Sequence, residues 1–103
     1  MIRAELYESN GLLNGFRISG HAGYAEKGND VVCAAVSSAV QLIVNLLNEF
    51  DCDPQMSVED NVVECRTSAS PNAASAMLEQ LKLHFETILE EFPKTIKITI
   101  SEV

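Results

Sequence analysis

Basic side chains are scarce in this 103-residue chain, where 7 lysines and arginines stand against 15 aspartates and glutamates. The formal net charge of -8 argues against non-specific nucleic-acid binding, which uses basic residues to displace counterions from phosphates. It also argues against docking to anionic membranes. An acidic surface instead favours encounter with a basic partner. We therefore expect no direct contact with nucleic acid or with a membrane.

The cysteines follow no pattern typical of secreted or zinc-binding domains. The chain has an odd number of cysteines, namely Cys33, Cys52 and Cys65, and their spacings fit no zinc motif. No secretory signal is recognisable, since charges begin at Arg3 and no apolar segment follows. The most apolar window, Val31–Leu47, is expected to be too short and too polar to span a bilayer. These absences predict a cytoplasmic protein with reduced thiols.

Internal repeats, linkers and low-complexity segments are absent as well, so we expect one domain over residues 1–103. Hydrophobic periodicity predicts seven elements. Strands are expected over 1–7, from 12–16 to 19, and over 55–59, 62–67 and 95–101, and helices over 30–50 and 70–92. Two Asn-Gly pairs, at 10–11 and 14–15, leave the position of the first turn open. The order predicts a two-layer α+β fold, with both helices on one face of a mainly antiparallel sheet.

The apolar patterns also predict which side chains face the core. In the strands these are Ile2, Ala4, Leu6, Phe16, Ile18, Ile96, Ile98 and Ile100, and the first helix has a wide apolar face that extends to Phe50. A helix this apolar must be covered on more than one side, by the sheet and by a second helix or subunit. Ser70 is expected to cap the second helix, ahead of Pro71 in its first position. Cys52 and Cys65 are interpreted as structural.

The residues with the strongest chemical potential lie between Gly20 and Cys33. His21 ends a predicted strand on its open side, and residues 22–28 are expected to form a mobile loop that closes on a ligand. A helix capped by Asn29 or Asp30 would place Cys33 at its third or fourth position. Unpaired N–H groups and the helix dipole there favour a thiolate. The backbone N–H groups of Val32, Cys33 and Ala34 are candidate oxyanion donors for the same reason.

This stretch resembles a family signature. The residues Gly20-His21-Ala22, then Gly28, then Asp30-Val31-Val32-Cys33-Ala34 and Ser37 are similar to the pattern of the bacterial ribosomal-processing cysteine protease family, Prp. In that pattern, Gly-His-Ala and a short loop precede Gly-x-Asp-Ile/Val-Val-Cys-Ala, and a serine follows one turn later. The resemblance covers essentially the whole chain. Val36 departs from the Ala-Gly-Ala that follows the cysteine in some members, which bears on substrate fit.

The resemblance implies a cytoplasmic, homodimeric endopeptidase, and we expect no cofactor and no metal. Its substrate would be a large-subunit ribosomal protein made with a short N-terminal extension, which the protease removes. By the same resemblance His21 and Cys33 form the catalytic dyad, Asp30 and Ser37 support it, and the substrate loop includes Gly20, Ala22, Gly23 and Gly28. Asp30 has three possible roles, which are capping the helix, orienting His21 and fixing the loop. Ser37 either bonds near the site or bonds back to its own helix.

Three other interpretations remain open from the residues. An acidic domain of this kind could bind a basic ribosomal protein without cutting it. A thiol redox sensor could pair Cys33 with Cys52 or Cys65. A metal site is the least supported, because His21 and Cys33 need a further protein ligand and Asp30 is the only obvious neighbour.

Overall fold

The computed structural model describes residues 1–20 and 27–103, with side chains described for 1–20 and 31–103. Its elements follow in the order β1 (Ile2–Ser9), β2 (Leu12–Ser19), α1 (Lys27–Glu49), β3 (Pro54–Glu59), β4 (Val62–Thr67), α2 (Pro71–Glu91) and β5 (Ile96–Glu102). This is the predicted order. The start of α1 is the one boundary that differs from the prediction by as much as three residues.

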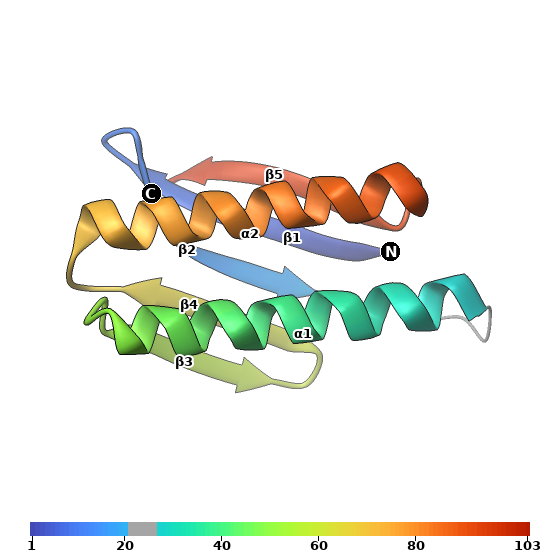
Figure 1. Ribbon diagram of the computed structural model, residues 1–103, viewed down its shortest axis with the longest axis horizontal. Coiled ribbons are helices and arrows are strands. Elements are labelled where there is room, and N and C mark those ends of the chain that lie inside the picture. Colours follow the sequence, from blue (N-terminus) through green and yellow to red (C-terminus); the bar gives the residue numbers. More distant parts are fainter. Residues whose placement is uncertain (21–26) are drawn as a thin grey trace.

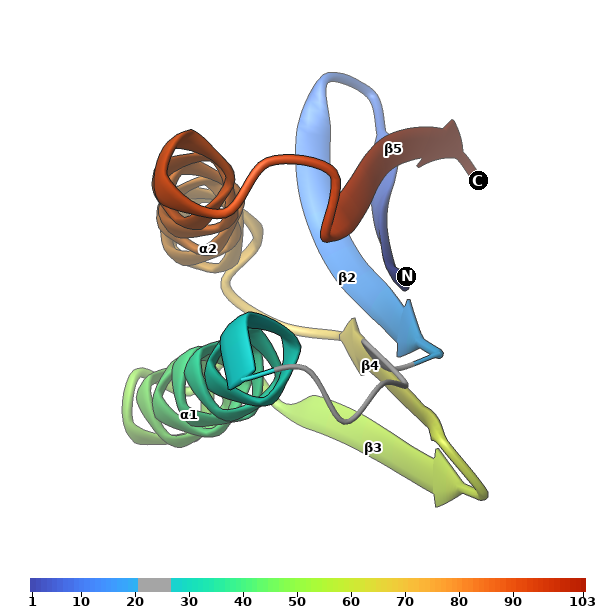
Figure 2. The same cartoon turned by 90° about the vertical axis from the view of Figure 1, so that its right-hand side faces the viewer.

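All five strands form one sheet in the order β3-β4-β2-β1-β5. Neighbouring strands are antiparallel except β1 and β5, which pair in parallel from Ile2 opposite Ile96 to Glu8 opposite Glu102. Both helices cover the same face of the sheet, and none of the residues that the structure describes forms a helix on the other face (Figures 1 and 2). The predicted two-layer α+β architecture with a mainly antiparallel sheet is therefore confirmed.

The first hairpin turns at Asn10-Gly11, which settles the choice between the two Asn-Gly pairs. Both turn residues have positive φ, 54° and 80°, as a two-residue type I′ hairpin requires. The second pair lies inside β2, next to the register irregularity between Tyr7 and Glu8. A Cβ on Gly15 would lie 2.4 Å from the carbonyl oxygen of Cys65, so glycine is needed there to let β4 approach.

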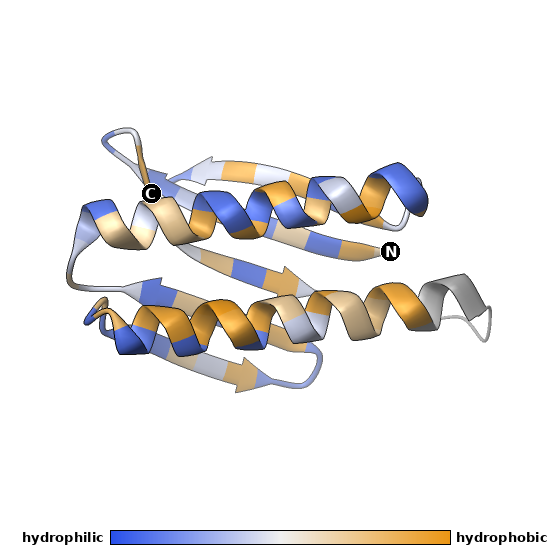
Figure 3. Cartoon of the chain, viewed as in Figure 1, coloured by the Kyte–Doolittle hydropathy of each residue, from blue (hydrophilic) through white to orange (hydrophobic). Residues whose placement is uncertain are grey.

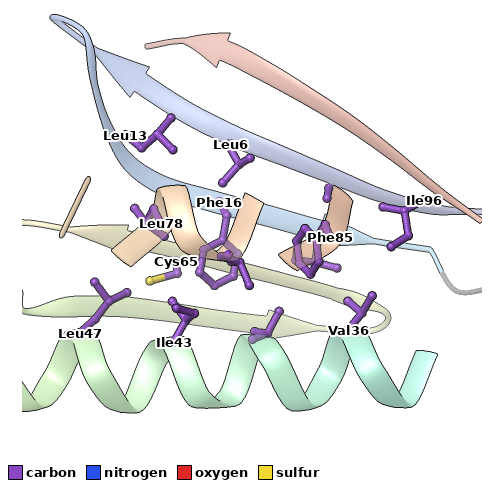
Figure 4. Close-up of a cluster of buried hydrophobic side chains, with 14 of the residues drawn as sticks. Leu6, Leu13, Phe16, Val36, Ile43, Leu47, Cys65, Leu78, Phe85 and Ile96 are labelled. Carbon is purple, nitrogen blue, oxygen red and sulfur yellow. The ribbon is translucent and has the colours of Figure 1, made fainter. Parts of the chain in front are cut away.

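The hydrophobic core lies between the sheet and the two helices (Figure 4). The predicted inward side chains of β1 and β2 are all buried, and Phe16 and Phe85 are fully enclosed. Cys65 faces the same core from β4, and Cys52 is buried just after α1. Their predicted structural role fits these positions.

Two predicted core residues are exposed. Ile100 is 47% exposed because β5 is an edge strand that leaves the cover of α2 as it runs, so that only Ile96 at its start is buried. Phe50 is 55% exposed because α1 ends at Glu49 and the chain reverses at Asp51, whose φ is 58°. Both predictions continued the apolar pattern of a strand or helix to residues that no other element covers.

The start of α2 also differs in detail from the prediction. Ser70 precedes Pro71 at the first helical position, as expected, but it adopts a left-handed conformation and its hydroxyl does not cap the helix. The Oγ atom instead donates a hydrogen bond of 2.9 Å to the carbonyl oxygen of Asp51. Ser70 therefore ties the start of α2 to the end of α1.

Helix α1 is apolar over most of its length, whereas α2 alternates between polar and apolar residues (Figure 3). The α1 segment Val31–Glu49 has a mean hydropathy of 1.8. By length and composition alone, it is long and apolar enough to cross a membrane. The prediction that the window Val31–Leu47 is too short and too polar to span a bilayer is therefore wrong by these two criteria. In the structure the inner face of this helix packs in the protein core through Val32, Val36, Val40, Ile43 and Leu47.

Candidate active site

Helix α1 begins at Lys27, so the prediction that it starts at Asp30 is wrong. Cys33 is consequently the seventh residue of the helix, beyond the first turn where the helix dipole acts most strongly. Gly28, expected in the loop, is helical as well. The N–H groups without a helical partner are those of the first four residues, 27–30. The predicted oxyanion donors at Val32, Cys33 and Ala34 are therefore inside the hydrogen-bonded part of the helix, and that prediction is not supported.

Cys33 is half-buried and lines a cavity of about 270 Å³. The cavity lies between the start of α1, the end of β2 and the turn between β3 and β4. Ser37 lines it too, as its position one turn after Cys33 predicts. Val32 is fully buried on the core side of the helix, and Ala34 is exposed. The thiol of Cys33 thus lies at a solvent-connected hollow rather than in the core.

Gly20 closes β2 at the edge of this cavity. Its φ is +71°, and a Cβ there would lie 2.7 Å from the carbonyl oxygen of Met1. Only glycine combines this conformation with so close an approach. His21 is the next residue in the sequence. His21, Ala22 and Gly23 themselves lie outside the described residues, as do the side chains of 27–30, including that of Asp30.

The β3–β4 turn contributes polar groups that sequence reasoning missed. Asp60 and Asn61 line the cavity together with Cys33. The sequence marks them only as turn residues, and they are separated from Cys33 by more than twenty-five positions. Pairing of β2 with β4 brings this turn beside the end of β2. No local sequence pattern predicts that Asp60 and Asn61 lie near Cys33.

A second cavity, of about 380 Å³, continues from the first along α1. The two cavities share the lining residues Ile18, Val36, Ser37 and Val63. We call their combined hollow the α1–β4 groove. Its second part is further lined by Val40, Gln41, Val44, Asn45 and Met56. Its walls are largely apolar, and one end opens at Cys33. An extended peptide segment with apolar side chains fits this description.

The other two cysteines have no such access. Cys52 and Cys65 are both fully buried. Burial raises the pKa of the Cys65 thiol to about 11. Burial and the nearby charge of Asp51 raise the pKa of the Cys52 thiol. Since the thiolate is the reactive form, both are poor nucleophiles and poor redox partners.

Among the side chains that the structure describes, no three of the metal-ligating types His, Cys, Asp and Glu come together. The metal site considered from sequence would use His21 and Asp30, whose side chains lie outside that set. The chemistry that the described residues offer is therefore that of an accessible thiol beside hydroxyl, carboxyl and amide groups.

Comparison with known proteins gives a consistent result. The model of a family described as cysteine protease Prp matches residues 1–97. The ribosomal processing cysteine protease Prp of Bacillus subtilis (strain 168) is 31% identical over 111 aligned positions, which cover 96% of each chain.

Solved structures show the same fold. The crystal structure of the ribosomal processing protease Prp from S. aureus, in complex with a covalently linked product peptide, superposes with a TM-score of 0.86. It is 24% identical and covers 98% of this chain and 100% of its own. A crystal structure of SMU.848 from Streptococcus mutans is 28% identical, with a TM-score of 0.79 over 100% of this chain and 96% of its own. The chain belongs to the Prp family of ribosomal processing cysteine proteases.

Proposed function

We propose that this chain is a cysteine endopeptidase that removes the short N-terminal extension of a bacterial large-subunit ribosomal protein. The observation that carries the proposal is the position of Cys33, the one cysteine that lines a solvent-connected cavity. The whole chain, residues 1–103, acts as one catalytic domain. Its relative from Bacillus subtilis is a ribosomal processing protease, which supports the same class of substrate here.

His21 and Cys33 form the catalytic dyad. The Cys33 thiol gives its proton to His21, and the resulting thiolate attacks the scissile carbonyl carbon. The C–N bond then breaks as protonated His21 donates this proton to the leaving amine, which leaves the acyl group bound to Cys33 as a thioester. His21 then accepts a proton from water, whose oxygen displaces the thiolate and releases the new carboxyl group. The short link from Gly20 to His21 supports this pairing, because Gly20 and Cys33 line the same cavity.

Asp30 and Ser37 support the dyad. Ser37 shares the cavity with Cys33 and can donate a hydrogen bond to bound substrate. Asp30 precedes Cys33 by three residues on α1 and so lies on a neighbouring part of the same helix face. Gly20, Ala22 and Gly23 belong to the substrate loop between the two catalytic residues.

The α1–β4 groove binds an apolar stretch of the substrate next to the scissile bond. Its continuity with the Cys33 cavity supports this role, since a peptide that reaches the thiol from that side must lie along α1. The acidic surface, with a net charge of -8, attracts the basic body of a ribosomal protein. The negative charge of the protein thus favours its encounter with the basic substrate, and the groove selects the segment of the substrate that is cut.

Exposed apolar side chains on α1 and directly after it support a homodimer. Val31, Leu42 and Phe50 are each more than half exposed, and such a surface is typical of an interface. A ribosomal substrate is consistent with a cytoplasmic location.

The experiment is cleavage of the extended ribosomal protein from the same organism, followed by sequencing of the new N-terminus. Cys33→Ala and His21→Ala should abolish cleavage, while the exposed Ser38→Ala on the same helix should cleave as wild type. Retained activity in either dyad variant would contradict the mechanism.

A non-catalytic acidic binding module is the alternative that the charge favours. It predicts that the wild-type protein binds the precursor without producing a shorter product. Cys33→Ala separates the two functions, because a protease inactivated in this way still binds the precursor.

A further inference from the structure

The sheet face opposite the helices carries a basic pocket near the start of β1. The pocket has a volume of about 240 Å³ and is lined by Arg3, Glu5, Arg17, Ser19, Lys97 and Thr99. These residues alternate with the buried Ala4, Leu6, Ile18 and Ile96 along β1, β2 and β5. Because strand side chains alternate between faces, the pocket lies on the opposite side of the sheet from the core.

This pocket concentrates positive charge in an acidic protein. It holds three of the seven basic residues, although the formal net charge of the chain is -8. Its one carboxylate, that of Glu5, accepts a hydrogen bond from the Ser101 hydroxyl. Within the part of the chain that the structure describes, the one ion pair joins Arg66 to Glu64, at 3.9 Å. No described carboxylate lies within ion-pair distance of a pocket cation, although Glu5 and Glu64 are the register partners of Arg17 on its two neighbouring strands. Arg3 and Lys97, in contrast, have no acidic register partner.

Strand pairing places two of these cations side by side on neighbouring strands. In the parallel pair of β1 and β5, Arg3 is the register partner of Lys97, and in the antiparallel pair of β1 and β2 it is opposite Ser19. Like charges on neighbouring strands destabilise a sheet. An anion bound between the two cations would remove that repulsion.

We propose that this pocket binds the phosphate group of a small anion. Arg3 and Arg17 provide planar guanidinium donors suited to a tetrahedral oxyanion, Lys97 adds a point charge, and the hydroxyl groups of Ser19 and Thr99 add further donors. A nucleic acid is the less favoured source of phosphate. Its many charges would be repelled by the acidic remainder of the molecule, whereas a small anion meets only the pocket.

Inorganic phosphate, titrated at constant ionic strength and followed by calorimetry and by thermal unfolding, tests the proposal. Phosphate should raise the unfolding temperature of the wild type, since a ligand that binds only the folded state stabilises it. Arg3→Gln and Lys97→Gln should each weaken binding by about tenfold, the loss expected for one charge-assisted interaction. Lys82→Gln, on α2, should bind as wild type.

A second readout separates a binding site from general surface charge. Without phosphate, Arg3→Gln should unfold at a higher temperature than wild type, because it removes the repulsion from Lys97. No binding by the wild type, or equal weakening by Lys82→Gln, would overturn the proposal. Tighter binding of a short RNA than of inorganic phosphate, compared per phosphate group, would overturn the assignment to a small anion. None of these measurements depends on proteolysis.

Discussion

The three cysteine thiols occupy very different surroundings, and their reactivity should differ accordingly. Cys33 lines an open cavity, while Cys52 and Cys65 are fully buried. We expect iodoacetamide at neutral pH to modify Cys33 and to leave the other two unmodified in the folded protein. Peptide mass spectrometry after brief labelling measures this directly.

Labelling after denaturation is the control, since all three thiols should then react. Fast modification of Cys65 in the folded state would contradict the buried environment described for it. Peroxide treatment extends the test: a disulfide between Cys33 and either buried cysteine would support the redox sensor in place of the protease.

Tyr7 should make the stability of the protein depend on alkaline pH. Burial, followed by the hydrogen bond that its hydroxyl donates to Glu64 at 2.6 Å, raises the pKa of Tyr7 to about 12. The unfolded chain releases this proton near pH 10. The folded state therefore holds the proton longer, and the stabilisation is complete below pH 10 and lost as the pH rises through about 12.

Tyr7→Phe isolates this contribution. The difference in free energy of unfolding between wild type and variant, measured with urea, should be constant up to pH 9 and shrink toward pH 12. The variant keeps the aromatic ring under the guanidinium of Arg66, which lies 4.5 Å from the ring centroid. A difference that does not change with pH would contradict the raised pKa.

Residues of the candidate site could be predicted from sequence where residue type and helical spacing were enough to identify them. The accessible thiol and its serine one turn later could be selected from sequence, because helical spacing alone places Cys33 and Ser37 on one face. Asp60 and Asn61 could not be selected, since they reach the cavity through the pairing of β2 with β4. That pairing depends on the whole sheet.

The end of β2 should tolerate no side chain at Gly20. Gly11 and Gly20 both have positive φ, 80° and 71°, but an added Cβ meets nothing within 4 Å at Gly11 and lies 2.7 Å from a backbone oxygen at Gly20. We expect Gly11→Ala to cost about 1 kcal/mol of stability from backbone strain alone. Gly20→Ala should cost more and should also slow cleavage, because it displaces the residue before His21. Chemical denaturation and peptide cleavage measure the two effects, and equal costs would contradict the close approach.

The α1–β4 groove gives a prediction with a matched control on one strand. Met56 lines the groove, whereas Val58, two residues further along β3, does not. Met56→Asp should raise KM for a peptide substrate by about tenfold, because it places a charge on an apolar binding surface. Val58→Asp should change KM little. Comparable effects of both variants would indicate a general loss of structure or of charge balance.

Elements were predictable to the extent that local pattern determines them. Alternation and helical spacing identified all seven, together with both breaks after the helices. The start of α1, the outward position of Phe50 and the exposure of Ile100 were not predictable. Each depends on where another element begins or stops covering the chain. The hydrophobic periodicity of a single segment gives no information about that.

The whole molecule should associate through α1. Leu42 is 59% exposed in the middle of this helix, on an apolar surface that no described element covers. Leu42→Lys should convert a dimer to a monomer, because a charge at an apolar contact opposes its burial. Sedimentation velocity measures the change, and Glu79→Lys on the exposed side of α2 is the control. A wild-type monomer at all concentrations would contradict the prediction.

The parallel pairing of β1 with β5 makes assembly of this sheet a strongly non-local event. Residues near position 2 pair with residues near position 96, so the most distant parts of the sequence must meet before β1 has neighbours on both sides. Contacts of such long range slow folding, since chain entropy must be lost before they form. We therefore expect a chain stopped before residue 96 to expose one hydrogen-bonding edge of β1, and to aggregate or be degraded before it can act.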